Sequence, residues 1–270
     1  MRKNKLSISL IIPRYQNMFS TFYTLEIIKE VSRQAIASDV DLLIETTWRI
    51  HSSSGVLFAD ILGNELGIKK AKRQKLPYLI LNYYEPNSKD NCIGIDNEKA
   101  SFEAVNYLLK AGHQRLATIT GKLSAQAGLQ RLAGFKKALK VSKIDLDKRY
   151  IVGGDWSKES GALAMKKLLS LKQPPTAVFV AGDEMAIGAM EVAKKAGLGI
   201  PDDISFVGFD NIPQANAPEV SLTTIEQPLP ELAQCGIKYL IQIIKKKPKQ
   251  PVKVLLENTR LIKRRSVKER

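Results

Sequence analysis

The sequence has 270 residues and lacks the features of several large protein classes. It contains only two cysteines, Cys92 and Cys235, which stand far apart and in no redox or metal-ligand spacing. We therefore expect reduced thiols in a cytoplasmic protein. No apolar run approaches the ~20 residues that a membrane-spanning helix needs. The short apolar run near the start lacks the small-residue cleavage site of a signal peptide, and it predicts a first strand instead.

Motifs of common enzyme classes are absent as well. No GxGxxG follows the first expected strand, and there is no P-loop, no GxSxG elbow and no HExxH. Asp183 and Asp210 could form an acid pair for glycoside hydrolysis only with one raised pKa and a defined separation. His51 and His113 have no catalytic partner nearby in the sequence, so both are interpreted as structural. We expect no enzyme, no metal site and no cofactor.

Positive charge is abundant, and it is unevenly distributed. The net charge is +15, and residues 245–270 hold eleven Lys or Arg against two Glu. A second basic segment is the helix expected over 64–75. Neither accompanies a base-reading module, because helix-turn-helix, zinc and aromatic-basic patterns are all missing. Contact with nucleic acid or an acidic surface is one interpretation of these segments, but a solvated face is the commoner one.

The stretch 176–210 predicts strand, turn, helix, turn and strand. The apolar run 177–180 is short and β-rich, and the period then changes to that of an amphipathic helix. Asp183 is placed to cap this helix and Gly197 to end it. A second buried run covers 204–209. A crossover helix between two short apolar strands indicates parallel pairing with a right-handed connection.

The same alternation runs through the whole chain. We expect strands at 6–12, 41–45, 56–59, 78–81, 92–95, 115–120, 150–152, 177–180, 204–209, 222–225, 252–256 and 259–263. We expect helices at 20–37, 64–75, 97–111, 126–140, 157–171, from 183, and at 229–247. This pattern predicts an α/β fold with parallel sheets, and the number of strands favours two sheets over one.

One interval is short for such a fold. Only nine residues, TTWRIHSSS, separate Glu45 from Gly55, whereas a parallel crossover needs a dozen or more. Either the two flanking strands are not a simple βαβ pair, or a segment is missing from the sequence. We favour the missing segment.

Several ordered motifs resemble a known family. They are VAGDEMAIGAM, GLGIPDDISFVGFDN, LTTIEQPLPELA, DNEKASFEAVNYLLKAGHQRLATITG, LQRLAGFKKAL and GDWS. Together they are similar to the effector-binding domain of LacI-type bacterial transcription regulators. The resemblance implies a type I periplasmic-binding-protein fold, in which two Rossmann-like lobes are joined by three crossovers. The implied lobes are 1–96 plus 228–257 and 97–227 plus 258–270, with a sugar, sugar phosphate or nucleoside in the cleft.

The residues and the resemblance indicate the same kind of site. Strand ends in parallel sheets line ligand crevices, which places Asp183 and Asp210 there, although each is also explained as a cap or a turn residue. The resemblance adds Arg131, Gln227 and Trp156, for which surface pairing or packing is the alternative. Further candidates lie in the first loop and at other strand ends, and they are Tyr15, Asn17, Phe19, Asp60, Asn82 and Tyr83. A guanidinium, a carboxylate and an aromatic face suit a sugar.

The resemblance also has implications for partners. Members of the family begin with a helix-turn-helix head that is absent here, so operator DNA is expected only through such a head. A homodimer is implied, while a phosphocarrier partner is neither indicated nor excluded. The alternative is a solute-binding receptor of a sugar transporter, which shares the fold and begins with a signal peptide or lipobox.

Overall fold

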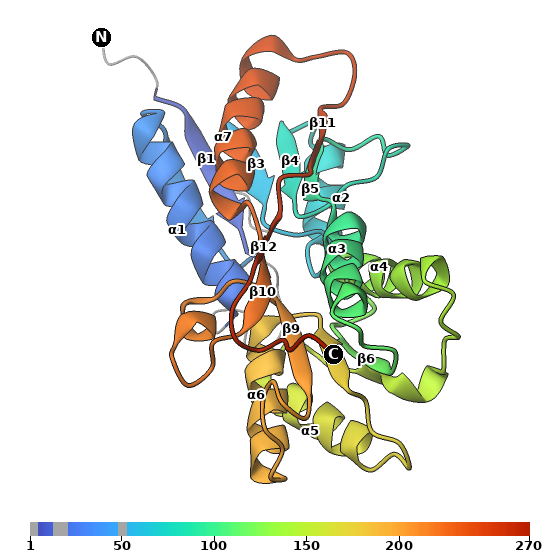
Figure 1. Ribbon diagram of the computed structural model, residues 1–270. Coiled ribbons are helices and arrows are strands. Elements are labelled where there is room, and N and C mark those ends of the chain that lie inside the picture. Colours follow the sequence, from blue (N-terminus) through green and yellow to red (C-terminus); the bar gives the residue numbers. More distant parts are fainter. Residues whose placement is uncertain (1–4, 13–20, 48–52) are drawn as a thin grey trace. The chain divides into compact units, whose positions relative to one another are not determined.

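The computed structural model describes residues 5–12, 21–47 and 53–270. The chain divides into two compact units, which we call unit 1 (Met1–Ile95 and Pro228–Leu256) and unit 2 (Asp96–Gln227 and Glu257–Arg270). It therefore passes from one unit to the other three times. Each unit has a six-stranded sheet of its own, so the expected α/β architecture with two sheets is confirmed (Figure 1).

The sheet of unit 1 has the strand order β11-β5-β4-β3-β1-β2, and every pair in it is parallel. Its strands are β1 (Ser7–Ile11), β2 (Asp41–Glu45), β3 (Gly55–Phe58), β4 (Tyr78–Leu81), β5 (Cys92–Ile95) and β11 (Lys253–Leu256). Its helices are α1 (Phe22–Ala37), α2 (Glu65–Arg73) and α7 (Leu229–Lys246).

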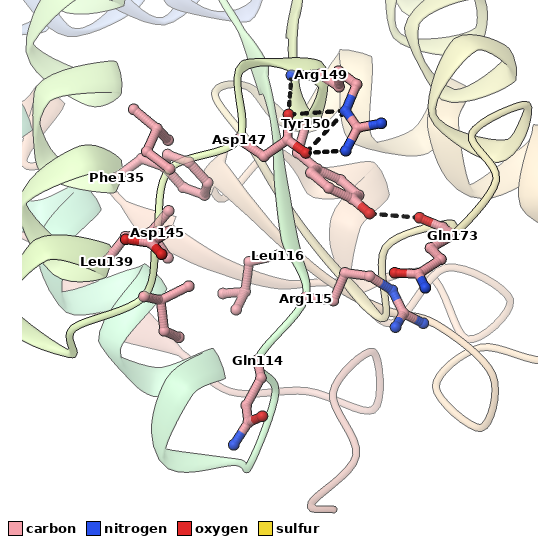
Figure 2. A pocket seen from close by; sticks show the side chains of 12 residues that line it. Gln114, Arg115, Leu116, Phe135, Leu139, Asp145, Asp147, Arg149, Tyr150 and Gln173 are labelled. Atoms are coloured by element: carbon pink, nitrogen blue, oxygen red, sulfur yellow. Dashed lines mark hydrogen bonds and ion pairs between the residues drawn. The ribbon is translucent and has the colours of Figure 1, made fainter.

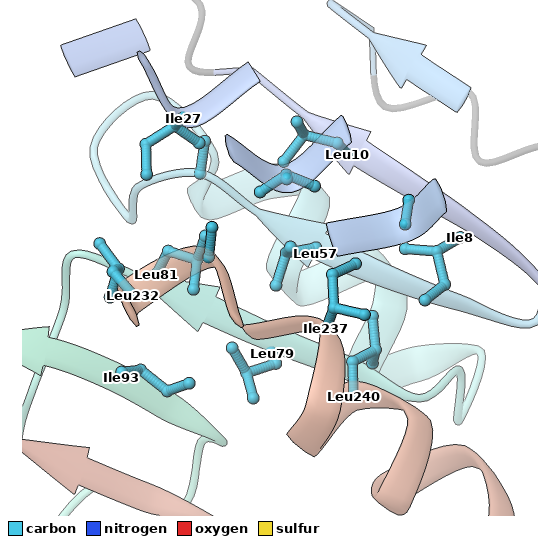
Figure 3. Close-up of a cluster of buried hydrophobic side chains, with 14 of the residues drawn as sticks. Ile8, Leu10, Ile27, Leu57, Leu79, Leu81, Ile93, Leu232, Ile237 and Leu240 are labelled. Atoms are coloured by element: carbon cyan, nitrogen blue, oxygen red, sulfur yellow. The ribbon is translucent and has the colours of Figure 1, made fainter. Parts of the chain in front are cut away.

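Helices cover both faces of this sheet. Alternate strand residues point to opposite faces, and Ile8, Leu57 and Leu79 join the buried side chains of α1 and α7 in one cluster (Figure 3). Residues of the other parity, such as Phe58, pack with Ile68 of α2 in a second cluster. Because strands buried on both faces are apolar throughout, β3, β4 and β5 read as continuous hydrophobic runs.

The sheet of unit 2 has the order β12-β10-β9-β8-β6-β7. Its strands are β6 (Leu116–Thr120), β7 (Ile151–Gly153), β8 (Ala177–Val180), β9 (Ser205–Asp210), β10 (Thr223–Glu226) and β12 (Arg260–Ile262). Its helices are α3 (Asn97–Lys110), α4 (Gln126–Val141), α5 (Lys158–Leu169) and α6 (Asp183–Lys195), with short 3-10 turns η2 (Lys148–Tyr150) and η3 (Pro213–Asn216). All pairs are parallel except β10 with β12.

Unit 2 is also layered. Phe135 of α4 and Leu108 of α3 pack with Phe179 and Phe209 of the strands in one buried cluster. Helices α5 and α6 also contact the strands, and they lie close to each other. Glycine makes that approach possible, because a Cβ on Gly161 would lie 2.1 Å from the carbonyl oxygen of Met185.

Two local expectations need correction. Asp183 does not cap α6, because Gly182 is the N-cap and Asp183 is the first helical residue, with its side chain turned to other partners. The expected stop is confirmed, since Gly197 follows the helix with a φ of 82°. The last strand, β12, is antiparallel to its neighbour rather than parallel.

The short interval before Gly55 is not explained by the strand pairing. Strands β2 and β3 are not paired with each other, since both pair with β1 from opposite sides. All three strands run parallel, so the chain must still cross over β1 between the end of β2 and the start of β3. Most of the interval (48–52) lies outside the described residues, so the proposed missing segment stays a prediction.

Candidate small-molecule site

Polar side chains of unit 2 converge at the edge of the sheet where the parallel strands end. Asp210 ends β9, Gln227 follows β10, and Arg131 reaches the same edge from α4. Asn97 begins α3, and Trp156 stands in the loop after β7. We call these five residues the arginine cluster.

Arg131 is the centre of this cluster, and it is only 4% exposed. Its Nε donates to Oδ1 of Asn97 (2.9 Å), and its Nη1 donates to the carbonyl oxygen of Ala181 (2.6 Å). The same Nη1 lies 3.5 Å from Oδ1 of Asp210. The guanidinium carbon sits 3.6 Å from the ring centroid of Phe209. Burial lowers the pKa of Arg131, but an arginine remains charged at neutral pH.

Asp210 is the more accessible member of the pair, with 17% of its side chain exposed. Its φ of 126° is in a region that residues other than glycine rarely adopt, so the end of β9 is strained. Gln227 donates from Nε2 to Oδ1 of Asp210 at 2.6 Å. Burial raises the pKa of Asp210, and the nearby Arg131 opposes that rise. The Oε1 atom of Gln227 is buried without a hydrogen-bond partner among the described residues.

Asp183 lies beneath the cluster and is fully buried. Its Oδ1 accepts from the hydroxyl of Thr224 (2.6 Å), and its Oδ2 accepts from the backbone N–H of Ile212 (3.0 Å). These bonds connect α6 to β10 and to the loop after β9, so Asp183 holds the segment that carries Asp210. Burial and the negative charge of Asp210 raise the pKa of Asp183.

Trp156 covers one side of the cluster. Its backbone has a φ of 81°, and its ring centroid lies 5.4 Å from the guanidinium carbon of Arg131. The ring rests on Gly121, where an added Cβ would lie 1.9 Å from a ring carbon. The absence of a side chain at Gly121 therefore sets the position of the indole.

Unit 1 has a smaller polar set at the corresponding edge of its own sheet. Asp60 follows β3, and its two carboxylate oxygens accept from Leu62 N (2.9 Å) and from Nδ2 of Asn82 (2.7 Å). Asn82 follows β4 with a φ of 54°, and its Oδ1 is buried without a partner among the described residues. Burial raises the pKa of Asp60 to about 6. Tyr83 follows Asn82 and is half-buried, and burial raises the pKa of its hydroxyl.

The structure thus brings some predicted site residues together. Arg131, Asp210, Gln227 and Trp156 form one cluster with Asp183 below it, and Asp60 pairs with Asn82 in unit 1. Their binding of a ligand stays a prediction. Three further candidates from the first loop lie outside the described residues, and they are Tyr15, Asn17 and Phe19.

Sequence reasoning missed three members of the arrangement. Asn97 bonds Arg131, Phe209 underlies its guanidinium, and Gly121 supports Trp156. Asn97 and Gly121 directly follow strand-like segments or their caps, which is the signal that could have identified them. Phe209 had no such signal, because an apolar residue inside a strand predicts only burial.

A cavity of about 240 Å³ in unit 2 lies elsewhere (Figure 2). It is lined by Leu116, which begins β6, and by residues from the end of α4, so it belongs to the opposite edge of the sheet. Some of its polar groups bond to one another: Arg149 pairs with Asp147, and the Tyr150 hydroxyl donates to the carbonyl oxygen of Gln173. This cavity is therefore not part of the arginine cluster.

Neither a membrane-spanning helix nor a metal-binding cluster occurs in residues 5–12, 21–47 and 53–270. None of the helices there is both long and apolar enough to span a membrane. Within the same ranges, no three His, Cys, Asp or Glu side chains gather in a way that could hold a metal ion.

Comparisons with known proteins agree with the fold and the motifs. The periplasmic binding protein-like domain family matches residues 105–267. The HTH-type transcriptional repressor CytR of Escherichia coli K12 is 42% identical over 170 residues, which are 63% of this chain and 50% of that protein. The HTH-type transcriptional repressor PurR of Shigella dysenteriae serotype 1 is 38% identical over 193 residues, 71% of this chain and 56% of that protein.

A solved structure extends the likeness to nearly the whole chain. The complex of the transcriptional regulator CelR with cellobiose superposes with a TM-score of 0.87 at 25% identity, covering 97% of this chain and 85% of the other. The chain spans about half the length of the curated relatives it matches. With a family match over more than half of its residues, the chain belongs to the periplasmic binding protein-like domain family.

Proposed function

We propose that this chain is the effector-binding domain of a LacI-type transcription regulator, and that it binds a sugar or related metabolite to control operator binding. The observation that carries the proposal is the arginine cluster at the strand ends of unit 2. The relatives named above support the regulatory role, since they are repressors and not transporter receptors or enzymes. A regulator of this kind acts in the cytoplasm, as a homodimer whose DNA-binding heads precede the domain.

The geometry of the cluster supports a hydroxyl-bearing ligand. Arg131 is almost fully buried, and two of its donors are already used, so it chiefly orients Asp210 and Asn97. Asp210 is the accessible acceptor, and charge-assisted hydrogen bonds to a carboxylate are directional. The half-buried indole of Trp156 offers an apolar face beside it. An acceptor next to an aromatic face matches the alternating polar and apolar sides of a sugar ring.

Control of DNA binding requires that the ligand favour one conformation. A ligand shifts a conformational equilibrium only by the difference between its affinities for the two states. The strained end of β9 is a suitable place for such a difference, because the φ of Asp210 is held at 126° by its surroundings. We propose that effector contacts to Asp210 change the conformation that the DNA-binding heads sense.

The first experiment is a thermal-shift screen of this chain against sugars, sugar phosphates, polyols and nucleosides, followed by calorimetry. A ligand at 100 times its Kd adds ~2.7 kcal/mol to the unfolding free energy, which is a readily measured shift. Asp210→Asn should weaken the confirmed ligand at least tenfold. Asp202→Asn is the matched control, because Asp202 is exposed and pairs with Lys268 before β9 begins.

Two results would contradict this proposal. One is a folded protein that binds nothing in a broad panel. The other is a ligand that binds Asp210→Asn as tightly as the parent chain. Asp60→Asn, measured with the same ligand, will show whether the polar set of unit 1 contributes to the same binding event.

A further inference from the structure

Several basic side chains gather at one edge of the unit 1 sheet. Strands β4, β5 and β11 are neighbours and run parallel, so their starting ends lie at the same edge. Each is preceded by a basic segment: the end of α2 and its turn precede β4, the loop with Lys89 precedes β5, and the end of α7 precedes β11. This edge is opposite to the one that carries Asp60 and Asn82.

Several of these cations are exposed, and no ion pair between described residues involves them. Six of them form what we call the basic edge, and they are Arg73, Lys75, Lys89, Lys246, Lys247 and Lys249. The acids at the same edge have partners of their own. Asp90 is bonded to Lys72 and to the hydroxyl of Tyr78. Asp39 and Asp41 share Lys5, which leaves one negative charge at the start of β2, three strands from β4. The basic edge therefore keeps an uncompensated positive charge.

The helix ends do not cancel this charge. Helices α2 and α7 end at the basic edge, and the C-terminus of a helix carries about half a negative charge. Two such ends offset only about one of the six cations. The remaining excess is large enough to attract a polyanion over distances of about one Debye length, roughly 8 Å at physiological salt.

The spacing of the cations suits a nucleic-acid backbone. Neighbouring strands are about 4.8 Å apart, so the three strand starts span about 10 Å before the reach of the side chains is added. Duplex DNA carries one phosphate charge per about 1.7 Å of axis when both strands are counted, which places about six phosphates, roughly three on each strand, along that length. Unpaired lysines on flexible stems contact phosphates without reading base edges.

We propose that the basic edge of unit 1 binds the phosphate backbone of duplex DNA without sequence preference. DNA is the favoured polyanion because β1 starts at this same edge, so a DNA-binding head preceding Lys5 would be attached there. That step rests on the proposed function. The basic edge would then add electrostatic affinity for the DNA that flanks an operator.

The test uses this chain and a fluorescein-labelled duplex of arbitrary sequence, about 20 base pairs long, in anisotropy titrations at several salt concentrations. Two triple variants remove opposite ends of the surface: Lys246→Gln, Lys247→Gln and Lys249→Gln in one, and Arg73→Gln, Lys75→Gln and Lys89→Gln in the other. The parent should bind with a steep salt dependence. Each variant should lower the slope of log K against log salt by about 2 to 3 and weaken binding at least tenfold.

The control variant carries Lys136→Gln, Lys140→Gln and Lys143→Gln, which are exposed lysines of unit 2 that take part in no ion pair between described residues. It changes the net charge by the same amount and should alter binding by less than about twofold. Melting curves of all variants confirm that they remain folded. An equal loss in the control would overturn the proposal, because binding would then follow net charge and not this surface.

Other results also count against the proposal. A loss in only one of the two basic-edge variants contradicts a surface that extends across three strands. Binding to polyglutamate but not to DNA indicates an acidic protein partner instead. The outcome is separable from that of the effector screen, because Asp210→Asn leaves the basic edge unchanged. If the chain binds DNA but the screen finds no effector, only the proposed function is contradicted, and the basic edge stands.

Discussion

The close contact between Gly208 and Asp183 gives a stringent prediction about the support of the arginine cluster. Gly208 lies in the central strand β9, two residues before Asp210. A Cβ added there would lie 2.0 Å from Oδ1 of Asp183 and 2.8 Å from a methyl carbon of Leu222. We therefore expect Gly208→Ala to disturb both the fold of unit 2 and the position of Asp210.

The magnitude follows from the bonds that must give way. Ordinary contact needs about 3.4 Å, so the carboxylate would have to move by roughly 1.4 Å. Its bond from Thr224 is 2.6 Å long, and such a movement breaks it. Losing a hydrogen bond to a charged group costs about 1.5–3 kcal/mol, and overpacking adds about 1–3 kcal/mol. We expect Gly208→Ala to lower the unfolding free energy by about 3–5 kcal/mol.

Urea denaturation followed by circular dichroism measures this loss. Gly153→Ala is the matched control, because Gly153 is an exposed glycine of edge strand β7 with no atom within 4 Å of its added Cβ. The control should change stability by less than about 0.5 kcal/mol. If Gly208→Ala unfolded like the parent chain, the buried carboxylate would not be held as described.

Three further outcomes are expected. Gly121→Ala should displace the indole of Trp156 and weaken the binding of any effector. In a chain that also carries Trp48→Phe, the fluorescence of Trp156 should shift, and an unchanged spectrum would contradict the ring contact. The raised pKa of Asp60 contributes stability that is fully present below pH ~4 and is lost as pH rises through about 6. Asp60→Asn should therefore remove up to about 3 kcal/mol of pH dependence from urea unfolding between pH 4 and 8, and parallel pH profiles would contradict it. Leu240→Ala should cost about 2–5 kcal/mol because Leu240 is fully buried, and equal melting curves for variant and parent would refute that role.

Much of the architecture could be predicted from periodicity. The runs at 78–81, 92–95 and 177–180 coincide with observed strands, because strands buried on both faces are short, apolar and bounded by turn residues. The run at 41–45 also coincides with a strand, β2, although this edge strand is largely exposed. The direction of β12 could not be predicted in this way. A three-residue strand carries too little pattern to fix its partner, and its pairing with β10 is a long-range contact.

The site was harder to predict than the fold. Strand ends place Asp210 and Asp183 at the same edge, but they do not say which carboxylate is accessible. That difference arises from Gly208, which lets Asp183 sit under β9, and from Thr224 and Ile212, which bond its oxygens. Ile212 and Thr224 are 29 and 41 positions away from Asp183 in the sequence, so no local pattern predicts these contacts.

The charge balance of the arginine cluster narrows the class of effector. Two carboxylates face a single guanidinium, and the pKa values of both acids are raised by burial. Arg131 is only 4% exposed, and its Nε and Nη1 already donate to Asn97 and to the carbonyl of Ala181, so little of the guanidinium is open to a phosphate. A phosphate placed there would add negative charge to a site that already has an excess of acids, whereas neutral hydroxyls can donate to Asp210. We therefore expect the neutral sugars and nucleosides of the panel to bind more tightly than their phosphate esters.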